Sequence, residues 1–326
     1  MGEFEMMKKT TSALAVAALL GTGAATAATF QVNDNTSFGV SANIGYSYVD
    51  GTNADGSSNT RLADNSSDLR FSGEAVSDSG LTSTLYIELD KFGTTDGDVQ
   101  QDINTDQMYI GVGGGFGTVE LGTDIGTYGV IDGLKDIDIW SGVTGFANDD
   151  DNNIRYTLPE MNGLTVQLGA NAYDDGSEQG DGTSVNGSIV YDLGNVSLSA
   201  AYDNRGGLDT GDDALYGFGV ATSLGGANIH ATYEEDTADE VTLMSLTSTY
   251  SVDSWYFYGV AQSVEGDNEA ALQNVVTAAG DDSVTQLNFG VGYSIMDNVT
   301  VYAEATRQGQ DNDEGDQNSL SVFVSF

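Results

Sequence analysis

The sequence predicts an all-β protein, a transmembrane antiparallel β-barrel of 16 strands. Three observations predict this fold. Apolar and polar residues alternate in segment after segment, short and long connections alternate between these segments, and aromatic residues gather at both ends of the apolar faces. Alternation with a period of two gives a strand one apolar and one polar face. Short turns on one side, long loops on the other and two aromatic girdles are typical of a barrel that crosses a membrane.

Residues 1–27 predict a signal peptide. Lys8 and Lys9 form a basic n-region, residues 13–20 read ALAVAALL, and residues 25–27 form an A-x-A cleavage signal. Residues 1–5 precede it as an N-terminal extension, with Met6 or Met7 as the natural start. The mature chain is then 28–326. It contains no apolar run of about 18 residues, so no transmembrane helix is expected.

The first strand, 36–49, has the clearest pattern. Its even positions from Phe38 to Tyr48 are apolar, whereas its odd positions from Ser37 to Ser47 carry Ser, Gly or Asn; the apolar residues are Phe38, Val40, Ala42, Ile44, Tyr46 and Tyr48. The same alternation predicts 15 further strands. They are expected near 69–75, 81–89, 108–112, 119–121, 154–158, 164–172, 184–192, 196–203, 214–224, 227–234, 241–251, 255–263, 284–294, 299–307 and 318–326.

The connections between these strands fall into two groups. The tight turns are 78–80, 113–115, 159–163, 192–195, 224–226, 252–254 and 296–298. The long loops are 50–66, 91–106, 124–152, 174–183, 204–213, 235–240, 264–283 and 308–317. Both termini then lie on the tight-turn side. The sole proline, Pro159, falls at a turn, where it interrupts no hydrogen-bond ladder.

A soluble β-sandwich is the alternative fold, since its strands alternate too. The polar face here is rich in Gly, Ser, Thr, Asn and Gln, which suits a water-filled lumen. The aromatics of the apolar face lie near strand ends: Phe38, Tyr191, Tyr250, Trp255, Tyr293 and Phe326 on the turn side, and Tyr46, Tyr48, Tyr202 and Tyr233 on the loop side. Two such girdles favour the membrane barrel.

Composition excludes several classes of function. The chain has 50 acidic and 9 basic residues, a net charge of −41, no cysteine and one histidine. Disulfides, thiolate metal sites and nucleic-acid binding are therefore not expected. The stretch DNDEGD at 311–316 lacks the spacing of a calcium loop, so no cofactor is predicted beyond loosely bound calcium or other divalent cations. We expect the acidic excess to reflect adaptation to a saline habitat, with loose divalent binding as the alternative explanation.

Several segments resemble the general diffusion porins of proteobacteria, especially the sixteen-stranded type of purple and marine bacteria. They are DLRFSGEAVSDSGLTSTLYIELD (68–90), GGFGTVELG (114–122), NNIRYTLPEMNGLTVQLG (152–169) and the terminal SVFVSF. The resemblance implies the outer membrane of a Gram-negative bacterium, a homotrimer among membrane lipids, and a third loop folded into the barrel. It also implies that Phe326, following Leu320, Val322 and Val324 at period two, is the sorting signal for the barrel-insertion machinery.

The longest loop, 124–152, is the candidate pore constriction. Its charged residues are predicted to line the narrowest part, while Ile131, Leu134, Ile137 and Trp140 pack on the wall with a spacing that hints at a short helix. The charged candidates are Asp124, Asp132, Lys135, Asp136 and Asp138. The alternative is a solvated surface loop. Relatives commonly carry an arginine near Thr123 and Asp124, so part of the family's basic wall is expected to be missing.

Arg70 and Arg155 are the candidates for the facing pore wall, together with Glu74 and Glu120. Both arginines have lumen parity and lie near mid-depth, and arginine keeps its charge at any working pH. Opposed acidic and basic walls would orient polar solutes by a transverse field. Alternatively, each arginine pairs with a lumen carboxylate such as Glu74 or Glu120, and both interpretations can hold together.

These features predict a passive channel for small hydrophilic solutes and ions that prefers cations, because lumen and mouth carry an excess of carboxylates. One alternative is an outer-membrane barrel with a plugged lumen that acts as a surface adhesin or structural anchor. A second alternative is an enzyme that uses the lumen-facing His230. No short motif supplies a nucleophile beside this histidine, so the protein is not predicted to be an enzyme.

Overall fold

The computed structural model describes residues 28–326 apart from 53–56, 66, 91–103, 138, 141–144, 147–152, 174–181, 205–213, 239, 267–282 and 309–315. The predicted signal peptide lies outside the described residues. Within the described chain, antiparallel strands and one short helix make up the regular structure. No helix among the described residues is long and apolar enough to cross a bilayer.

The first nine strands are β1 (Ala28–Asn33), β2 (Thr36–Thr52), β3 (Ser58–Asp64), β4 (Asp68–Val76), β5 (Thr82–Asp90), β6 (Asn104–Gly114), β7 (Gly117–Thr123), β8 (Asn153–Thr157) and β9 (Leu164–Tyr173). The helix α1 (Gly129–Asp132) lies between β7 and β8. The remaining strands are β10 (Gly182–Asp192), β11 (Val196–Asp203), β12 (Leu215–Leu224), β13 (Ala227–Asp236), β14 (Val241–Val252), β15 (Trp255–Gly266), β16 (Ser283–Met296), β17 (Val299–Arg307) and β18 (Gln317–Ser325).

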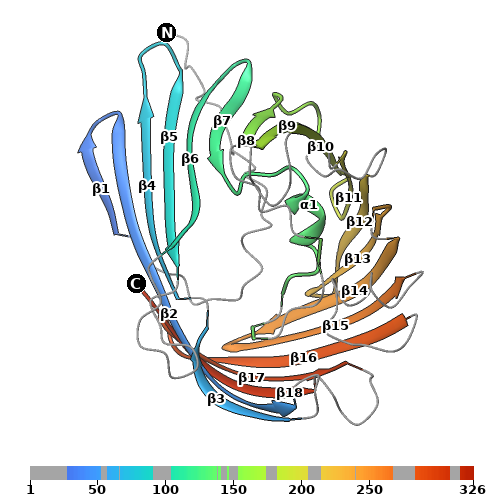
Figure 1. The fold of residues 1–326 in the computed structure, drawn as a ribbon. Coiled ribbons are helices and arrows are strands. Elements are labelled where there is room, and N and C mark those ends of the chain that lie inside the picture. Colours follow the sequence, from blue (N-terminus) through green and yellow to red (C-terminus); the bar gives the residue numbers. More distant parts are fainter. Residues whose placement is uncertain are drawn as a thin grey trace.

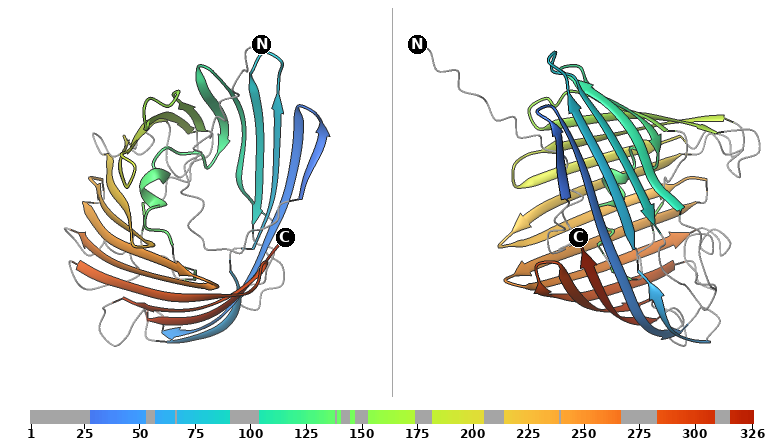
Figure 2. Two further views of the ribbon diagram at one scale, coloured as in Figure 1. Left: turned by 180° about the vertical axis from the view of Figure 1, so that it is seen from behind. Right: turned by 90° about the vertical axis from the view of Figure 1, so that its left-hand side faces the viewer.

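The strands close into a ring of sixteen (Figure 1). From β4 to β18 each strand pairs with the next along the chain, and β2 joins the two ends by pairing with both β4 and β18. In the side view the strands run obliquely across the wall (Figure 2). A closed ring leaves no free sheet edge, so every strand of the wall finds backbone partners on both sides. The predicted sixteen-stranded antiparallel barrel is confirmed.

Two strands were not predicted, and both pair with β2. β3 pairs with residues 46–52 of β2 and β4 with residues 36–43, so these two strands share one position in the ring. On the other side of β2, β18 pairs with residues 43–51 and β1 with residues 36–40. β3 falls inside the predicted loop 50–66. Here the strands extend beyond the apolar band of the wall, so the alternation of apolar and polar residues that marks the other strands is missing.

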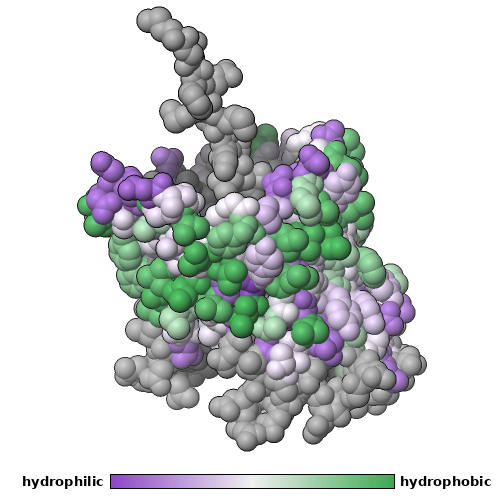
Figure 3. All heavy atoms as spheres, turned by 90° about the horizontal axis from the view of Figure 1, so that it is seen from above, coloured by the Kyte–Doolittle hydropathy of each residue, from purple (hydrophilic) through white to green (hydrophobic). Residues whose placement is uncertain are grey.

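The burial pattern is inverted relative to a soluble protein. Outward side chains are large and apolar yet exposed, such as Ile110, Phe218 and Phe289, at 57%, 54% and 58%. Inward side chains are polar yet buried, such as Ser184 and Asn288, both at 0%. Figure 3 shows outer apolar residues as a band across the face of the wall in view. An apolar surface this extensive is unfavourable in water and is stable against lipid, which excludes the soluble sandwich.

The tight turns gather at one end of the barrel. The connection between β12 and β13 is the two-residue hairpin Gly225-Gly226, with φ angles of 62° and 89°. A two-residue hairpin that matches strand twist requires positive φ at its central positions, which glycine adopts without strain. The predicted turn at 224–226 is therefore a register-fixing hairpin.

Phe326 lies just past the end of β18, on the lipid-facing side. Its side chain is 58% exposed, its N–H donates to the carbonyl of Ala42 at 2.8 Å, and its own carbonyl accepts from the N–H of Ala42 at 3.0 Å. Strand β18 itself ends one residue earlier than predicted, at Ser325, although the ladder continues through Phe326.

Deleting Phe326 is expected to lower the amount of folded protein in the outer membrane several-fold, because the last ladder bonds and the terminal outward aromatic are both lost. The measurement is a competition between the deletion variant and the full-length chain during membrane assembly. Deletion of Asp34 in the exposed β1–β2 turn serves as a control for the loss of one residue. Equal membrane levels of the Phe326 deletion and the full-length chain would refute its role as an assembly signal.

Candidate functional site

The connection between β7 and β8, residues 124–152, is called the inner loop here, and its described residues, 124–137, 139–140 and 145–146, lie inside the barrel. Figure 1 shows α1 within the ring, beside β11 and β12. Glycines of β12 make room for it: a Cβ on Gly217 would lie 2.7 Å from the Tyr128 hydroxyl, and a Cβ on Gly219 2.4 Å from Leu134 Cδ1. Larger residues at these two positions would displace the loop from the wall. The predicted infolding of the third loop is confirmed.

A buried ion pair holds the first part of the inner loop. Lys135 Nζ lies 2.5 Å from Glu234 Oε1 on β13, and the two side chains are 1% and 0% exposed. The Tyr128 hydroxyl donates to the second oxygen of Glu234 at 3.2 Å, and Asp132 lies 3.2 Å from the lysine. Buried charges persist only when they are paired and hydrogen-bonded in this way. Lys135, predicted to line the constriction, instead lies between the loop and the wall.

A second carboxylate holds the far part of the inner loop. Glu304 of β17 accepts the N–H of Ile139 at 2.7 Å and that of Trp140 at 3.3 Å, and it also accepts the hydroxyl of Tyr258. The indole N–H of Trp140 donates to Gln317 at 2.9 Å. The two glutamates of β13 and β17 therefore fasten the loop at two points along the wall.

Apolar packing fills the space between these two anchors. Ile131, Leu134 and Ile137 are 0%, 6% and 0% exposed, so the prediction that they pack on the wall is confirmed. Ile137 lies in a cluster with inward-facing aromatics, Tyr256, Tyr258 and Tyr302. The alternating pattern did not predict this cluster, because a lumen face was expected to be uniformly polar. The signal was present in the alternation of β15, where both faces carry aromatics.

His230 has a structural position beneath the inner loop. Its side chain is 5% exposed, and its Nδ1 lies 2.8 Å from the carbonyl oxygen of Leu134. A carbonyl can only accept, so Nδ1 carries the proton and donates. The imidazole ring of His230 therefore helps to hold the inner loop against the wall. Among the described residues, no three His, Asp or Glu side chains are grouped to hold a metal ion.

The facing wall contains the two predicted arginines, and each is paired with carboxylates. Arg70 Nη2 lies 2.9 Å from Glu88 and 3.1 Å from Asp68. Arg155 Nε donates to Glu120 at 2.7 Å. Glu88 is the direct register partner of Arg70 on β5, and Glu120 is that of Arg155 on β7. Opposite charges at directly opposed positions of an antiparallel pair attract each other, so strand register itself creates these pairs.

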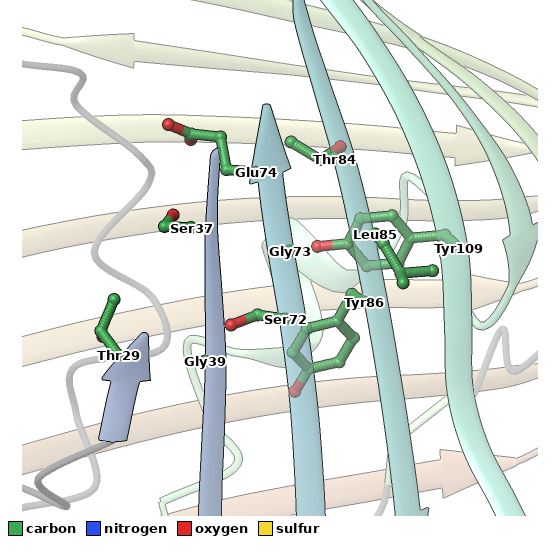
Figure 4. Close-up of a pocket in the computed structure, with 10 residues that line it drawn as sticks. All are labelled: Thr29, Ser37, Gly39, Ser72, Gly73, Glu74, Thr84, Leu85, Tyr86 and Tyr109. Atoms are coloured by element: carbon green, nitrogen blue, oxygen red, sulfur yellow. The ribbon is translucent and has the colours of Figure 1, made fainter. Parts of the chain in front are cut away.

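The remaining predicted residues lie apart from these pairs. Asp132 is 37% exposed and Asp136 is exposed, both on the inner loop, while the carbonyl of Asp124 accepts the amide of Gln107 at 2.5 Å. Asp138 lies outside the described residues. Glu74 projects from β4 on the lumen side (Figure 4).

One basic residue was not predicted for the site. Arg61 of β3 lies over the ring of Trp140, 5.6 Å from its centroid. It falls in a segment expected to be a loop, which concealed its lumen parity. Three described arginines therefore lie near the inner loop and the facing wall. Arg70 and Arg155 pair with carboxylates of the wall, and Arg61 contacts Trp140 of the inner loop.

Comparison with known proteins gives consistent results. A family profile described as "Gram-negative porin" matches residues 11–313. A "Monosaccharide porin" from Halomonas sp. and a "Major outer membrane protein" from Halomonas elongata are both 27% identical, over 98% of this chain and 100% of the relative.

Solved structures share the fold at low sequence identity. Salmonella typhi OmpF, in complex with daunomycin, aligns with a TM-score of 0.72 and 14% identity over 92% of this chain and 100% of its own. An anion-selective porin from Comamonas acidovorans aligns with a TM-score of 0.69 and 17% identity, over 89% and 100%. A trimer form of OmpT from Vibrio cholerae has a TM-score of 0.64 and 14% identity, over 90% and 99%.

Proposed function

The chain belongs to the Gram-negative porin family, and on that premise we propose that it is a cation-preferring channel whose constriction lies between the inner loop and the wall of β4–β8. The protein is a passive, non-enzymatic channel of the outer membrane. The solutes we propose are small and hydrophilic, in keeping with the relative described as a monosaccharide porin. The comparisons give no support to a plugged surface adhesin.

The observation that carries this proposal is the pairing of the wall arginines. Arg70 and Arg155 each have a carboxylate within 2.9 Å, so their positive charges are offset at contact distance. Glu74 adds a carboxylate with no basic partner among the described residues. In a narrow channel with low-dielectric walls, an excess of one charge raises the local concentration of the opposite ion. The wall therefore favours cations.

The barrel fold alone does not set the sign of selectivity, since a neighbour with the same fold is described as anion-selective. What differs between such channels is the set of side chains that project into the lumen. Here the whole chain has 50 acidic residues against 9 basic ones. The acidic excess of the chain and the pairing of the arginines both favour cations over anions.

Ion selectivity is expected to depend on salt concentration. The Debye length is ~10 Å at 0.1 M and ~3 Å at 1 M, so carboxylates at the mouth act across the vestibule only in dilute salt. Zero-current potentials across a KCl gradient should show marked cation preference in dilute KCl and a weaker residual preference near 1 M. Anion preference at both concentrations would overturn the proposed selectivity.

The residual preference is expected to come from charges next to the ion path. Replacing Asp132, Asp136 and Asp138 by Asn together should remove most of the selectivity that survives at 1 M KCl. Replacing Glu160 in the exposed turn between β8 and β9 by Gln provides a matched control with unchanged selectivity. If the triple variant keeps the parental potential at 1 M, the inner loop does not form the constriction.

We also propose a homotrimer, which the trimer form of a structural neighbour supports. Part of the outer wall would then pack on neighbouring barrels instead of lipid. On unheated gels the protein is expected to migrate as a trimer, and boiling should convert it to a monomer. Native mass spectrometry from mild detergent gives an independent measurement, and a monomer there would contradict the proposal.

A further inference from the structure

A hollow of about 330 Å³ lies on the lumen wall between the Arg70–Glu88 pair and the tight-turn end of the barrel (Figure 4). Side chains from five neighbouring strands, β1, β2, β4, β5 and β6, line it. We call it the Glu74 hollow and define it by Ser37, Ser72, Glu74, Thr84, Tyr86 and Tyr109. Cation preference would depend only on the charge of Glu74, and it would not require the shape or the hydroxyl groups of the hollow.

Strand register builds this hollow from two adjacent rows. Ser72, Tyr86 and Tyr109 are successive register partners across β4, β5 and β6. Ser37, Glu74 and Thr84 are successive partners across β2, β4 and β5. Positions two apart on a strand point to the same side, so both rows project into the lumen. The hollow is thus assembled by the rigid wall and needs no loop.

Two inward-facing glycines leave space at the hollow: Gly39 lines it, and Gly111 is the register partner of Thr84 beside it. A Cβ on Gly39 would lie 2.5 Å from Ser72 Oγ, and a Cβ on Gly111 would lie 2.4 Å from Thr84 Oγ1. Side chains at these inward positions would occupy the space next to the two hydroxyls. The concave shape therefore depends on the absence of side chains at two adjoining places in the wall.

The polar groups of the hollow have unused hydrogen-bonding capacity. Within the described part of the chain, the side chains of Ser37, Ser72, Glu74, Thr84 and Tyr109 have no hydrogen-bond partner. In Figure 4 the Tyr109 hydroxyl points towards β4, and the Glu74 carboxylate extends over β2 near Ser37. Four hydroxyls that can donate or accept thus surround one carboxylate that can accept several hydrogen bonds.

Two aromatic rings form one side of the hollow. Tyr86 and Tyr109 stack with their centroids 5.3 Å apart and their planes at 22°. The Tyr86 hydroxyl donates to Glu88 at 2.5 Å, which fixes the orientation of its ring. A tyrosine presents an apolar ring with a polar tip, and such a pair suits a ligand that has both apolar C–H groups and hydroxyls.

The charges around the hollow indicate a neutral ligand. An anion would meet the Glu74 carboxylate, and the arginines on either side are already paired with Glu88 and Glu120. A compact cation would use the carboxylate and the hydroxyl oxygens as ligands, but it would leave the O–H donors without an acceptor. A neutral ring that carries several hydroxyls uses every group: its hydroxyls bond to Glu74 and to the Ser and Thr side chains, and its C–H groups contact the tyrosines.

We propose that the Glu74 hollow is a weak binding subsite for a neutral monosaccharide in transit through the channel. The proposal deepens the channel function above and rests on it. A transport subsite must bind strongly enough to collect the solute and weakly enough to release it. An open site on a rigid wall, with one carboxylate and a handful of hydroxyls, meets both conditions.

The test uses the full-length protein in planar bilayers in KCl, with an aldohexose such as glucose as the probe. The open-channel current first shows that the channel conducts, independently of any sugar. Added glucose should then produce excess current noise that saturates at millimolar concentration. Glycerol at matched viscosity is the control, and it should lower the current without saturable noise.

Two variants locate the effect. Glu74→Gln keeps the shape of the side chain and removes its charge, and it should raise the half-saturating glucose concentration about tenfold, the loss expected for one hydrogen bond to a charged group. Gly111→Ala places a Cβ against the Thr84 hydroxyl, which lines the hollow, and should act in the same direction. Gly115→Ala is its matched control, because Gly115 lies in the turn between β6 and β7, outside the hollow, and a Cβ there would have no neighbour within 4 Å.

Several outcomes would overturn the subsite while leaving the channel intact. One is a parent channel that conducts normally but shows no saturable response to glucose. Another is a glucose response that both Glu74→Gln and Gly111→Ala leave unchanged. A third is stronger saturable block by tetramethylammonium than by glucose, which would make the hollow a cation site. A chain without ohmic current in KCl would instead contradict the channel function itself.

Discussion

Replacing Lys135 by Met is expected to release the inner loop and turn a steady single-channel current into one that fluctuates between conductance levels. The substitution leaves Glu234 buried at 0% exposure without its cation. Removing one partner of a buried ion pair costs about 3–5 kcal/mol, because the remaining charge is uncompensated. That cost acts on the attachment of the loop, since both residues lie between the loop and the wall.

A second substitution tests whether the unpaired charge is the cause. The double variant Lys135→Met with Glu234→Met replaces the ion pair by apolar side chains of similar length, which is often neutral or stabilising. It should return the current to a steady level. Glu235→Gln changes the adjacent carboxylate, whose side chain hydrogen-bonds to the lipid-facing Tyr233 instead of the loop, and should have no effect. A steady current in Lys135→Met alone would show that the ion pair does not hold the loop.

Replacing Glu88 and Glu120 by Gln together is expected to reduce the cation-to-anion permeability ratio several-fold in dilute KCl. These carboxylates lie 2.9 Å from Arg70 and 2.7 Å from Arg155. Without them, Arg155 loses its carboxylate partner and Arg70 keeps only Asp68, so the wall presents more positive charge to the lumen. Arginine cannot lose its proton to relieve this charge. Zero-current potentials across a KCl gradient measure the change.

The control for this variant neutralises the same number of carboxylates at positions that are not paired with an arginine. Glu160→Gln with Glu235→Gln lowers the net negative charge equally, but neither residue is paired with an arginine among the described residues. If this control shifts selectivity as much as Glu88→Gln with Glu120→Gln does, total charge sets selectivity and the pairing of the wall arginines does not.

The barrel was predictable from the sequence because its physical cause is local. A wall between lipid and water must alternate along every strand, so each strand carries its own record of the environment on both sides. Sixteen strands were located in this way. Strands β1 and β3 were not predicted. Each pairs with only one part of the long strand β2, and another strand pairs with the rest of that edge of β2. Such pairing between distant segments leaves no trace in a periodic pattern.

The candidate site was predictable in part. Parity placed Arg70, Glu74, Glu120 and Arg155 in the lumen, and the spacing of Ile131, Leu134 and Ile137 indicated the wall-facing side of the inner loop. The role of Lys135 could not be inferred, because its partner Glu234 is far away in the sequence on β13. The aromatic cluster around Ile137 was hidden for the same reason, since a loop that covers the lumen wall makes that part of the wall a core.

The amino-acid sequence alone was sufficient to predict the number of wall strands, the face that each side chain occupies and the end of the barrel at which the turns lie. These features follow from the chain's local alternation between apolar and polar residues. In contrast, the folded chain is needed to see which charges cancel and which remain. Pairing between Arg70 and Glu88, or between Lys135 and Glu234, depends on strand register and on the path of the inner loop. The energy between two charges depends on their separation in space, and the number of residues between them in the sequence does not give that separation.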